Sequence, residues 1–296
     1  MTDFVATLIA RPENASDLET AATVCGAAVA VTRSDVLSGN EAIDLYFSSS
    51  DFIETHRAAL EARVAGTSVD VVVQPVANRR KRLLVADMDS TIIGQECIDE
   101  LADFVGLKAK VAAITDRAMR GEIEFEPALR ERVALLAGLP EETIDKVIAE
   151  RVTLNPGAKT LVWTMRANGA TCILVSGGFT AFAEKVAAMV GFNESHANVL
   201  LASGGKLTGK VQEPILGRSA KLATLEDAMI RFDIPPDRTL AVGDGANDLA
   251  MIRRAALGVA YHAKPKVAEA AAARIDHADL TALLYAQGYK RHQFVE

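Results

Sequence analysis

Two aspartates directly follow a short apolar run: residues 83–86 are all aliphatic, and Asp87 and Asp89 come next. An unbroken apolar run is typical of a strand buried on both faces of a parallel sheet. Because side chains alternate along an extended chain, both carboxylates point to the same side at the end of this strand. Two carboxylates this close resist joint ionisation unless a cation lies between them or one keeps its proton. The pattern indicates metal binding or acid–base chemistry, although a polar helix start after a strand also fits it.

Two later apolar runs end in polar clusters of the same kind. Residues 171–175 and 239–242 both favour buried strands, and the clusters that follow them contain Ser176, Gly177, Gly178, Asp244, Asn247 and Asp248. In open α/β sheets, ligands bind outside the carboxyl ends of the strands. The three strand ends therefore predict one convergent site.

The chemistry of these groups favours a hard cation and a phosphate. Carboxylates without histidine or cysteine ligands suit Mg²⁺, which binds few carboxylates together with phosphate oxygens. The five histidines are scattered singly and predict no zinc site. Glycines let the backbone approach a ligand closely, and amides at a helix start bind phosphate oxygens. Lys221, in the first turn of a helix predicted over residues 219–232, supplies a point charge for the same anion.

Alternating strands and helices from residue 83 onward predict an α/β fold with a doubly wound, parallel, Rossmann-like sheet. Further strands are expected at residues 257–261 and 273–275, and a hairpin over residues 197–212. Residues 94–153 contain four helix candidates between the first two strands. A segment of this length is too long for a connection, so it is expected to form a helical cap.

The N-terminal residues 1–75 show the order βαββαβ, which is the ferredoxin-like arrangement. This order resembles an ACT-type domain, a module often attached to enzymes of amino-acid metabolism. A dimerisation or stabilising appendage without a ligand remains an open alternative. The predicted division is therefore residues 1–75, a basic linker over 76–82, a catalytic core of 83–93 and 154–296, and the cap over 94–153.

Composition narrows the function classes. The formal net charge of −7 argues against a nucleic-acid binder, which usually carries a basic excess. Three widely spaced cysteines without a Cys-x-x-Cys pair suit reduced thiols. Charged residues within the first twenty positions leave no secretory apolar core, and no apolar run is long enough for a membrane span. We expect a cytoplasmic protein that acts on a small molecule.

The ordered motifs resemble those of the haloacid dehalogenase (HAD) superfamily of phosphotransferases. Its four motifs are matched by residues 87–91, by Ser176, by Lys221 and by residues 243–248. Glu96, Phe125, Arg132 and the Ser-Gly-Gly-Phe sequence at residues 176–179 narrow the resemblance to phosphoserine phosphatases, which catalyse the last step of serine biosynthesis.

The resemblance implies a role for each motif residue. Asp87 is the expected nucleophile, which forms an aspartyl-phosphate, and Asp89 is the expected general acid and base. Mg²⁺ is expected on Asp87, the backbone carbonyl of Asp89, and Asp244, with Asp248 and Asn247 supporting the metal and its waters. The remaining motif residues, Ser176, Gly177 and Lys221, are expected to hold the phosphoryl oxygens, and Asn247 is also counted among the substrate-binding residues.

The expected substrate, O-phosphoserine, is matched by residues of the cap. Arg132 lies on the apolar stripe of its helix, where a guanidinium either extends to solvent or faces an anion in a closed cleft. We favour the second reading, with Arg132 bound to the substrate carboxylate. The resemblance alone assigns Glu96 to the substrate ammonium and places Phe125 and Met119 beside the substrate.

Alternative functions remain open at this stage. The chain could act on another small phosphomonoester such as phosphohomoserine, or transfer the phosphoryl group to an acceptor alcohol. It could also be a non-catalytic regulatory protein whose N-terminal domain senses an amino acid. A homodimer formed through that domain is a further expectation.

Overall fold

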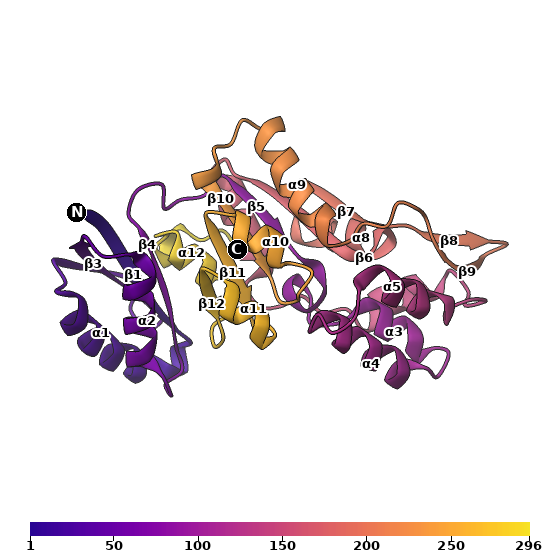
Figure 1. Cartoon of the computed structure of the whole chain (residues 1–296), viewed down its shortest axis with the longest axis horizontal. Helices are drawn as coiled ribbons and strands as arrows, with labels where there is room; N and C mark the ends of the chain where they lie inside the picture. Colours follow the sequence, from indigo (N-terminus) through magenta and orange to yellow (C-terminus); the bar gives the residue numbers. More distant parts are fainter.

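The computed structural model describes all residues 1–296, and its centre is a six-stranded parallel sheet (Figure 1). The strand order is β12-β11-β10-β5-β6-β7, and every neighbouring pair is parallel. This is the Rossmann order, in which the chain direction across the sheet reverses between the first and fourth strands, here β5 and β10. The bounds are β5 (Leu83–Ala86), β6 (Thr171–Phe179), β7 (Glu194–Asn198), β10 (Thr239–Gly243), β11 (Leu257–Tyr261) and β12 (Ala273–Ile275). The predicted doubly wound sheet is confirmed.

Helices cover both faces of this sheet, and alternate residues of each strand supply the two cores. Leu84 of β5 and Leu174 of β6 belong to the core on one face, whereas Leu83 and Val85 belong to the core on the other. The first face is covered by α7 (Ala158–Ala167), α8 (Thr180–Val190) and α12 (Ala282–Ala286), and the second by α9 (Arg218–Arg231), α10 (Leu249–Arg254) and α11 (Pro265–Ala270).

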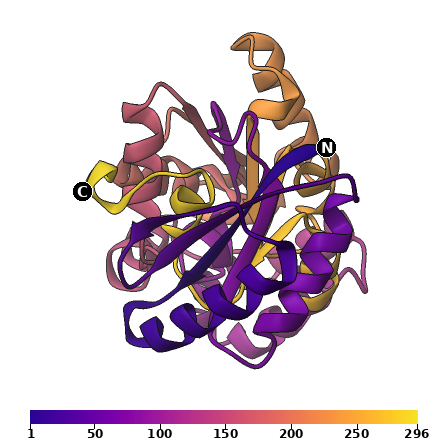
Figure 2. The same cartoon turned by 90° about the vertical axis from the view of Figure 1, so that its left-hand side faces the viewer.

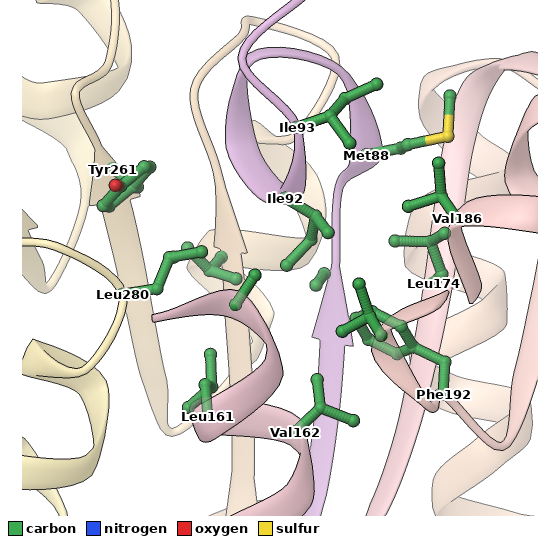
Figure 3. Packing of buried hydrophobic residues seen from close by; sticks show 14 of the residues in the cluster. Met88, Ile92, Ile93, Leu161, Val162, Leu174, Val186, Phe192, Tyr261 and Leu280 are labelled. Atoms are coloured by element: carbon green, nitrogen blue, oxygen red, sulfur yellow. The ribbon is translucent and has the colours of Figure 1, made fainter. Parts of the chain in front are cut away.

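The turn after β5 is fixed by packing as well as by hydrogen bonds. Met88 and Ile92, at the two ends of this turn, are fully buried. Figure 3 shows Met88 extending toward Leu174 and Val186 on the first face of the sheet. The Ile93 amide also donates to the Met88 carbonyl at 3.0 Å. The side chains on either side of Asp89 are therefore anchored in the core, which sets the position of the aspartate.

The segment between β5 and β6 forms a helical cap, as predicted. Its helices are α3 (Cys97–Asp103), α4 (Lys108–Met119), α5 (Phe125–Ala134) and α6 (Thr143–Glu150). The chain enters and leaves the cap side by side, because the Gly94 amide donates to the Thr153 carbonyl at 3.0 Å. The hairpin of β8 (Leu200–Ser203) and β9 (Lys206–Val211) extends from the core and attaches to the cap, where the Gly138 amide donates to the Leu207 carbonyl at 2.8 Å (Figure 1).

The N-terminal part forms a separate antiparallel sheet in the order β2-β3-β1-β4, with two helices on one face, which is the predicted ferredoxin-like fold (Figure 2). Its elements are β1 (Thr2–Ala10), α1 (Ala15–Val29), β2 (Arg33–Ser38), β3 (Ala42–Ser49), α2 (Ile53–Val64) and β4 (Val69–Pro75). The other face packs against the C-terminal part of the chain, because Ile9 and Val72 join the same core cluster as Tyr285 of α12.

A buried arginine joins these two parts. Arg79 donates from both terminal nitrogens to Asp44 of β3, each at 2.6 Å, and from Nε to the Ala286 carbonyl at 2.8 Å. Asp44 is fully buried. The segment predicted as a linker therefore contributes an ion pair to the packed interface between the two sheets.

The sequence-based element bounds differ from the structure mainly at strand β7. Residues 197–203 were expected as one hairpin strand, but Glu194–Asn198 is the edge strand of the central sheet and β8 begins only at Leu200. This strand is polar and lies at the sheet edge, so it lacks the apolar run of a buried strand. None of the helices combines the length and apolar character that a membrane span requires.

Candidate active site

Asp87 and Asp244 lie at the ends of adjacent strands, where the chain direction across the sheet reverses. Ala86 of β5 pairs with Val242 of β10, and the Asp87 amide donates to the Val242 carbonyl at 3.0 Å. Asp248, at the start of α10, completes the group. Carboxylate oxygens of Asp87, Asp244 and Asp248 lie within 4.8 Å of one another, and all three residues are buried. The structure thus brings two of the predicted strand ends to one point.

Lys221 is the only cation in contact with these carboxylates. Its Nζ donates to Oδ1 of Asp87 at 2.5 Å and to Oδ1 of Asp248 at 2.6 Å, and its side chain is 1% exposed. Burial alone would lower the pKa of Lys221, but Asp248 and Asp87 raise it, so the lysine stays charged. One positive charge therefore faces three carboxylates.

This excess of negative charge fits a divalent cation. Burial raises the pKa of Asp244 well above its usual range, and the Asp87 and Glu96 charges add to the effect. Buried carboxylates without a compensating cation are costly, and hard oxygen donors prefer hard cations. Asn247, beside Asp248, has a buried Oδ1 without a hydrogen-bond partner. The cluster can hold a divalent metal together with a polar ligand.

Asp89 is oriented by two hydrogen bonds of its carboxylate. Oδ1 accepts from the Cys97 amide at 2.9 Å, and Oδ2 accepts from Oγ of Ser176 at 3.0 Å. The Gly178 amide in turn donates to Oγ of Ser176 at 2.8 Å. The side chain of Asp89 is therefore held between α3 and β6, and its predicted contact with the metal through the backbone carbonyl stays a prediction.

A small pocket lies between the core and the cap. The predicted site residues that line it are Asp87, Asp89, Glu96, Met119, Phe125, Arg132, Gly177 and Asn247. Four other predicted site residues do not line the pocket: Ser176, Lys221, Asp244 and Asp248. Ser176 contacts the lining residue Asp89, and Lys221 contacts the lining residue Asp87. A Cβ atom at Gly177 would lie 2.6 Å from the Phe125 ring, so this close approach requires glycine.

Glu96 and Arg132 bring a carboxyl group and a guanidinium to the cap side of the pocket. Oε1 of Glu96 accepts from Oγ of Ser90 at 2.6 Å, and burial together with the Asp89 charge raises the pKa of Glu96 to about 8. Arg132 is 5% exposed. Burial lowers the pKa of Arg132, and among the nearby carboxylates Glu96 opposes this effect most strongly. Of the two readings of Arg132, the structure has the guanidinium inside the cleft.

Two residues that the sequence did not single out belong to the same site. Thr115 lines the pocket, and its hydroxyl contacts both Arg132 and Asp99. Thr115 precedes Met119 by four positions, so helical spacing places both on one face of α4. The spacing from Met119, a predicted site residue, is the feature of the sequence that indicates Thr115.

Comparison with known proteins identifies the family. Residues 84–253 match the family model of haloacid dehalogenase-like hydrolases. A phosphoserine phosphatase from Albidiferax ferrireducens is 46% identical over 208 residues, which cover 69% of this chain and 88% of that protein. The chain belongs to the haloacid dehalogenase-like hydrolase family.

Other curated relatives are longer than this chain. A phosphoserine phosphatase from Mycobacterium tuberculosis is 43% identical over 235 residues, 79% of this chain, and the chain spans only 57% of that relative's length. The same share of the Streptomyces coelicolor phosphoserine phosphatase is covered, at 42% identity. The predicted resemblance to phosphoserine phosphatases is thereby confirmed.

Solved HAD structures cover both the core and the full chain. A substrate-bound phosphoserine phosphatase complex aligns with a TM-score of 0.67 and 38% identity, covering 70% of this chain and 98% of that one. A HAD family hydrolase from Salmonella enterica aligns over 97% of this chain and 98% of its own, with a TM-score of 0.85 and 26% identity. The second alignment includes the N-terminal sheet, so the two-part architecture occurs in another HAD protein.

Proposed function

We propose that this chain is a Mg²⁺-dependent phosphoserine phosphatase, which hydrolyses O-phosphoserine to serine and phosphate. One observation carries the proposal: a single pocket is lined by Asp87 of the core and by the carboxyl of Glu96 and the guanidinium of Arg132 from the cap. O-phosphoserine carries a phosphate, an ammonium and a carboxylate. The pocket offers a partner for each of these three groups, and the relatives named phosphoserine phosphatase support the same substrate.

In the proposed reaction, Asp87 attacks phosphorus in line and forms an aspartyl-phosphate. Its Oδ1 is held by Lys221, whereas Oδ2 accepts no hydrogen bond. The free oxygen is the one that can attack. Lys221 also lies close enough to the nucleophile to meet phosphoryl oxygens once they arrive there, and its charge would then stabilise the transferring group.

Asp89 is proposed to move the protons. In its acid form it would protonate the departing serine oxygen, and as a base it would then accept a proton from the water that hydrolyses the aspartyl-phosphate. The hydrogen bonds from Ser176 and the Cys97 amide support this role, because they fix the carboxylate beside the nucleophile. Two oriented acids on one strand end are what a two-step displacement requires.

The carboxylates of Asp87 and Asp244 and the backbone carbonyl of Asp89 would hold Mg²⁺, with Asp248 in support. When bound, the ion neutralises charge on the phosphoryl oxygens and orients them for in-line attack. The three buried carboxylates around a single lysine support this assignment.

At the other end of the pocket, Arg132 is proposed to bind the substrate carboxylate and Glu96 the ammonium. Phe125 and Met119 would exclude water around the small substrate, since both line the pocket. Ser176, Gly177 and Asn247 are proposed to contact the phosphoryl oxygens. The amide nitrogen of Asn247 is the group that would donate to a phosphoryl oxygen, whereas its unpartnered Oδ1 is an acceptor and supports a bound water or metal at that position.

Each predicted segment of the chain has its own role in the proposed enzyme. Residues 83–93 and 154–296 would form the phosphatase core, residues 94–153 the cap that selects the substrate, and residues 1–75 an ACT-like domain joined by residues 76–82. The enzyme would supply serine as the last step of its biosynthesis in the cytoplasm. A homodimer through the N-terminal domain stays a prediction.

The test is phosphate release from a panel of small phosphomonoesters, measured with Mg²⁺ and again with chelator. O-phosphoserine should be preferred over phosphohomoserine, phosphothreonine and an aryl phosphate, and chelator should stop release from all of them. A preference for phosphohomoserine would establish the alternative substrate. Added serine that diverts phosphate from water would establish a phosphotransferase. No release from any ester would favour the regulatory alternative.

A further inference from the structure

A chain of polar side chains crosses the interior of the cap. It consists of Asp99 on α3, Thr115 on α4 and Arg132 on α5, one residue from each helix. All three side chains are buried, with exposed fractions of 9%, 3% and 5%. Buried polar groups of this kind are costly unless each is satisfied, so a fully connected chain indicates a specific role.

We propose that Thr115, held by Asp99, is a positioning residue that aims Arg132 at the carboxylate of the substrate. This inference rests on the proposed function, because it assigns Arg132 to the carboxylate of an amino-acid phosphoester. It adds Thr115 and Asp99 as residues that set substrate selectivity. They act by orienting the Arg132 guanidinium and do not themselves bind the substrate carboxylate.

The direction of the hydrogen bonds supports the proposal. The Thr115 hydroxyl carries one proton, and two acceptors lie within reach: Oδ1 of Asp99 at 2.7 Å and the Val111 carbonyl at 3.1 Å. The shorter contact, to the carboxylate, takes the proton. The lone pairs of the hydroxyl oxygen are then available to Nη1 of Arg132, which donates to it at 2.9 Å. The carbonyl oxygen of Ala128 accepts from Nε of Arg132 at 3.1 Å. These two contacts, one from Nε and one from Nη1, fix the plane of the guanidinium.

The second terminal nitrogen of Arg132, Nη2, is left for a ligand. Nη2 donates no hydrogen bond to the protein, and both acceptors of Nε and Nη1 are neutral oxygens. Arg132 forms no direct ion pair with an aspartate or glutamate, although it is buried and lines the pocket. A buried guanidinium without an anionic partner is completed by an anion from outside the protein, and a carboxylate fits its planar geometry.

Thr115 also acts as a spacer between Asp99 and Arg132. Without its side chain, the Asp99 carboxylate and the guanidinium face each other across a gap, and Arg132 is drawn toward Asp99 rather than toward the substrate. The Thr115 hydroxyl is hydrogen-bonded to both groups, so the Asp99 carboxylate stabilises the guanidinium while the two groups stay apart. This arrangement explains why the buried cation remains available to a ligand.

A purely structural role for the chain, as a tie between three cap helices, makes a different prediction. Loss of a structural tie lowers thermal stability and affects all substrates alike. Loss of a positioning contact affects only those substrates that carry the carboxylate. O-phosphoethanolamine provides the comparison, since it retains the phosphate and the ammonium of O-phosphoserine but lacks the carboxylate.

The experiment measures kcat and KM for both esters in the full-length chain and its variants, with Mg²⁺ present. Thr115→Val keeps the shape of the side chain and removes the hydroxyl. We expect kcat/KM for O-phosphoserine to fall by about 10- to 100-fold, mainly through KM, as for a lost hydrogen bond to a charged group. O-phosphoethanolamine should change by less than about threefold, within the context dependence of a contact that substrate does not use. Thr115→Ser, which restores the hydroxyl, should approach the wild type.

Controls separate this inference from the proposed function. Thr143→Val alters another buried threonine of the cap, which does not line the pocket, and should leave the ratio of the two esters unchanged. Equal losses on both esters in Thr115→Val, or no loss on either, would overturn the positioning role while the phosphoserine phosphatase stands. A wild-type enzyme without preference for O-phosphoserine over O-phosphoethanolamine would overturn both. If Thr115→Val does not fold, Asp99→Asn tests the same chain with the same two esters, and the same loss of preference is expected.

Discussion

Lys221 and Asp87 form a buried ion pair in which Nζ lies 2.5 Å from Oδ1, with 1% and 4% of the two side chains exposed. The lysine therefore fixes the carboxylate that follows strand β5 and leaves its Oδ2 without a hydrogen-bond partner. The same Nζ holds Asp248 at 2.6 Å, so one cation sets the position of residues from two strand ends.

Replacement of Asp87 by asparagine should abolish turnover with the fold intact. The amide cannot act as the nucleophile, and kcat should fall by at least about 10⁴-fold, as for other lost nucleophiles. The substitution also removes one of three crowded carboxylates, so the melting temperature should stay close to that of the wild type. Asp145→Asn, at an exposed position of the cap, is the matched control. A variant that keeps more than a hundredth of wild-type activity would contradict the assigned role.

Metal binding should be visible without any substrate. Because three buried carboxylates face one lysine, Mg²⁺ should raise the melting temperature of the wild type in a concentration-dependent way. Asp244→Asn removes a ligand and should reduce this increase, and it should require more Mg²⁺ for activity. The measurement is a thermal melt over a Mg²⁺ series with a chelated reference. Identical melts with metal and with chelator would argue against a cation at this cluster.

The interface between the two sheets should depend on Arg79. Replacing it by methionine leaves the fully buried Asp44 without a cationic partner, which should lower the free energy of unfolding by about 3–5 kcal/mol. Lys146→Met removes an exposed pair with Glu142 and should cost less than about 0.5 kcal/mol. Denaturant titrations of both variants give the comparison. Similar small losses in the two variants would mean that the buried pair does not stabilise the interface.

Lys81 should make stability rise with pH above neutrality. Burial lowers the pKa of Lys81 to about 8, whereas an unfolded lysine titrates near ~10.4. Between these two pKa values the unfolded state binds more protons than the folded state, so stability rises with pH. Below pH 8 the folded protein bears the full cost of burying the charged lysine, and this cost is lost as the pH rises. The wild type should therefore gain stability relative to Lys81→Met from about pH 8 to pH 10. A difference that is constant over this range would show that Lys81 does not titrate as assigned.

The chemistry and architecture of the core were predictable because they depend on local patterns. The apolar run before Asp87 and the glycine-rich sequence around Asp244 identify strand ends, and the parallel sheet then brings these ends together. The helical cap follows from the four helix candidates in residues 94–153 and from the length of that segment. Strand β7 was missed for the opposite reason, since Glu194–Asn198 is polar and owes its strand form to pairing with β6.

The contacts that connect separate helices could not be predicted from the sequence. Asp99 and Thr115 have the composition of ordinary polar helix positions, and only the packing of α3 against α4 brings them together. Arg79 stands in a basic segment that is typical of an exposed linker, but the structure places it against Asp44. In each case the partner is distant in sequence, so its identity depends on the tertiary fold.

The most direct test of the proposed chemistry is acid quenching of the enzyme during turnover of O-phosphoserine labelled at phosphorus, followed by mapping of the labelled peptide. We predict an acid-stable phosphoryl group on Asp87 in the wild type and none in Asp87→Asn. Rapid turnover of O-phosphoserine without any labelled protein, or a label on a different residue, would contradict the account.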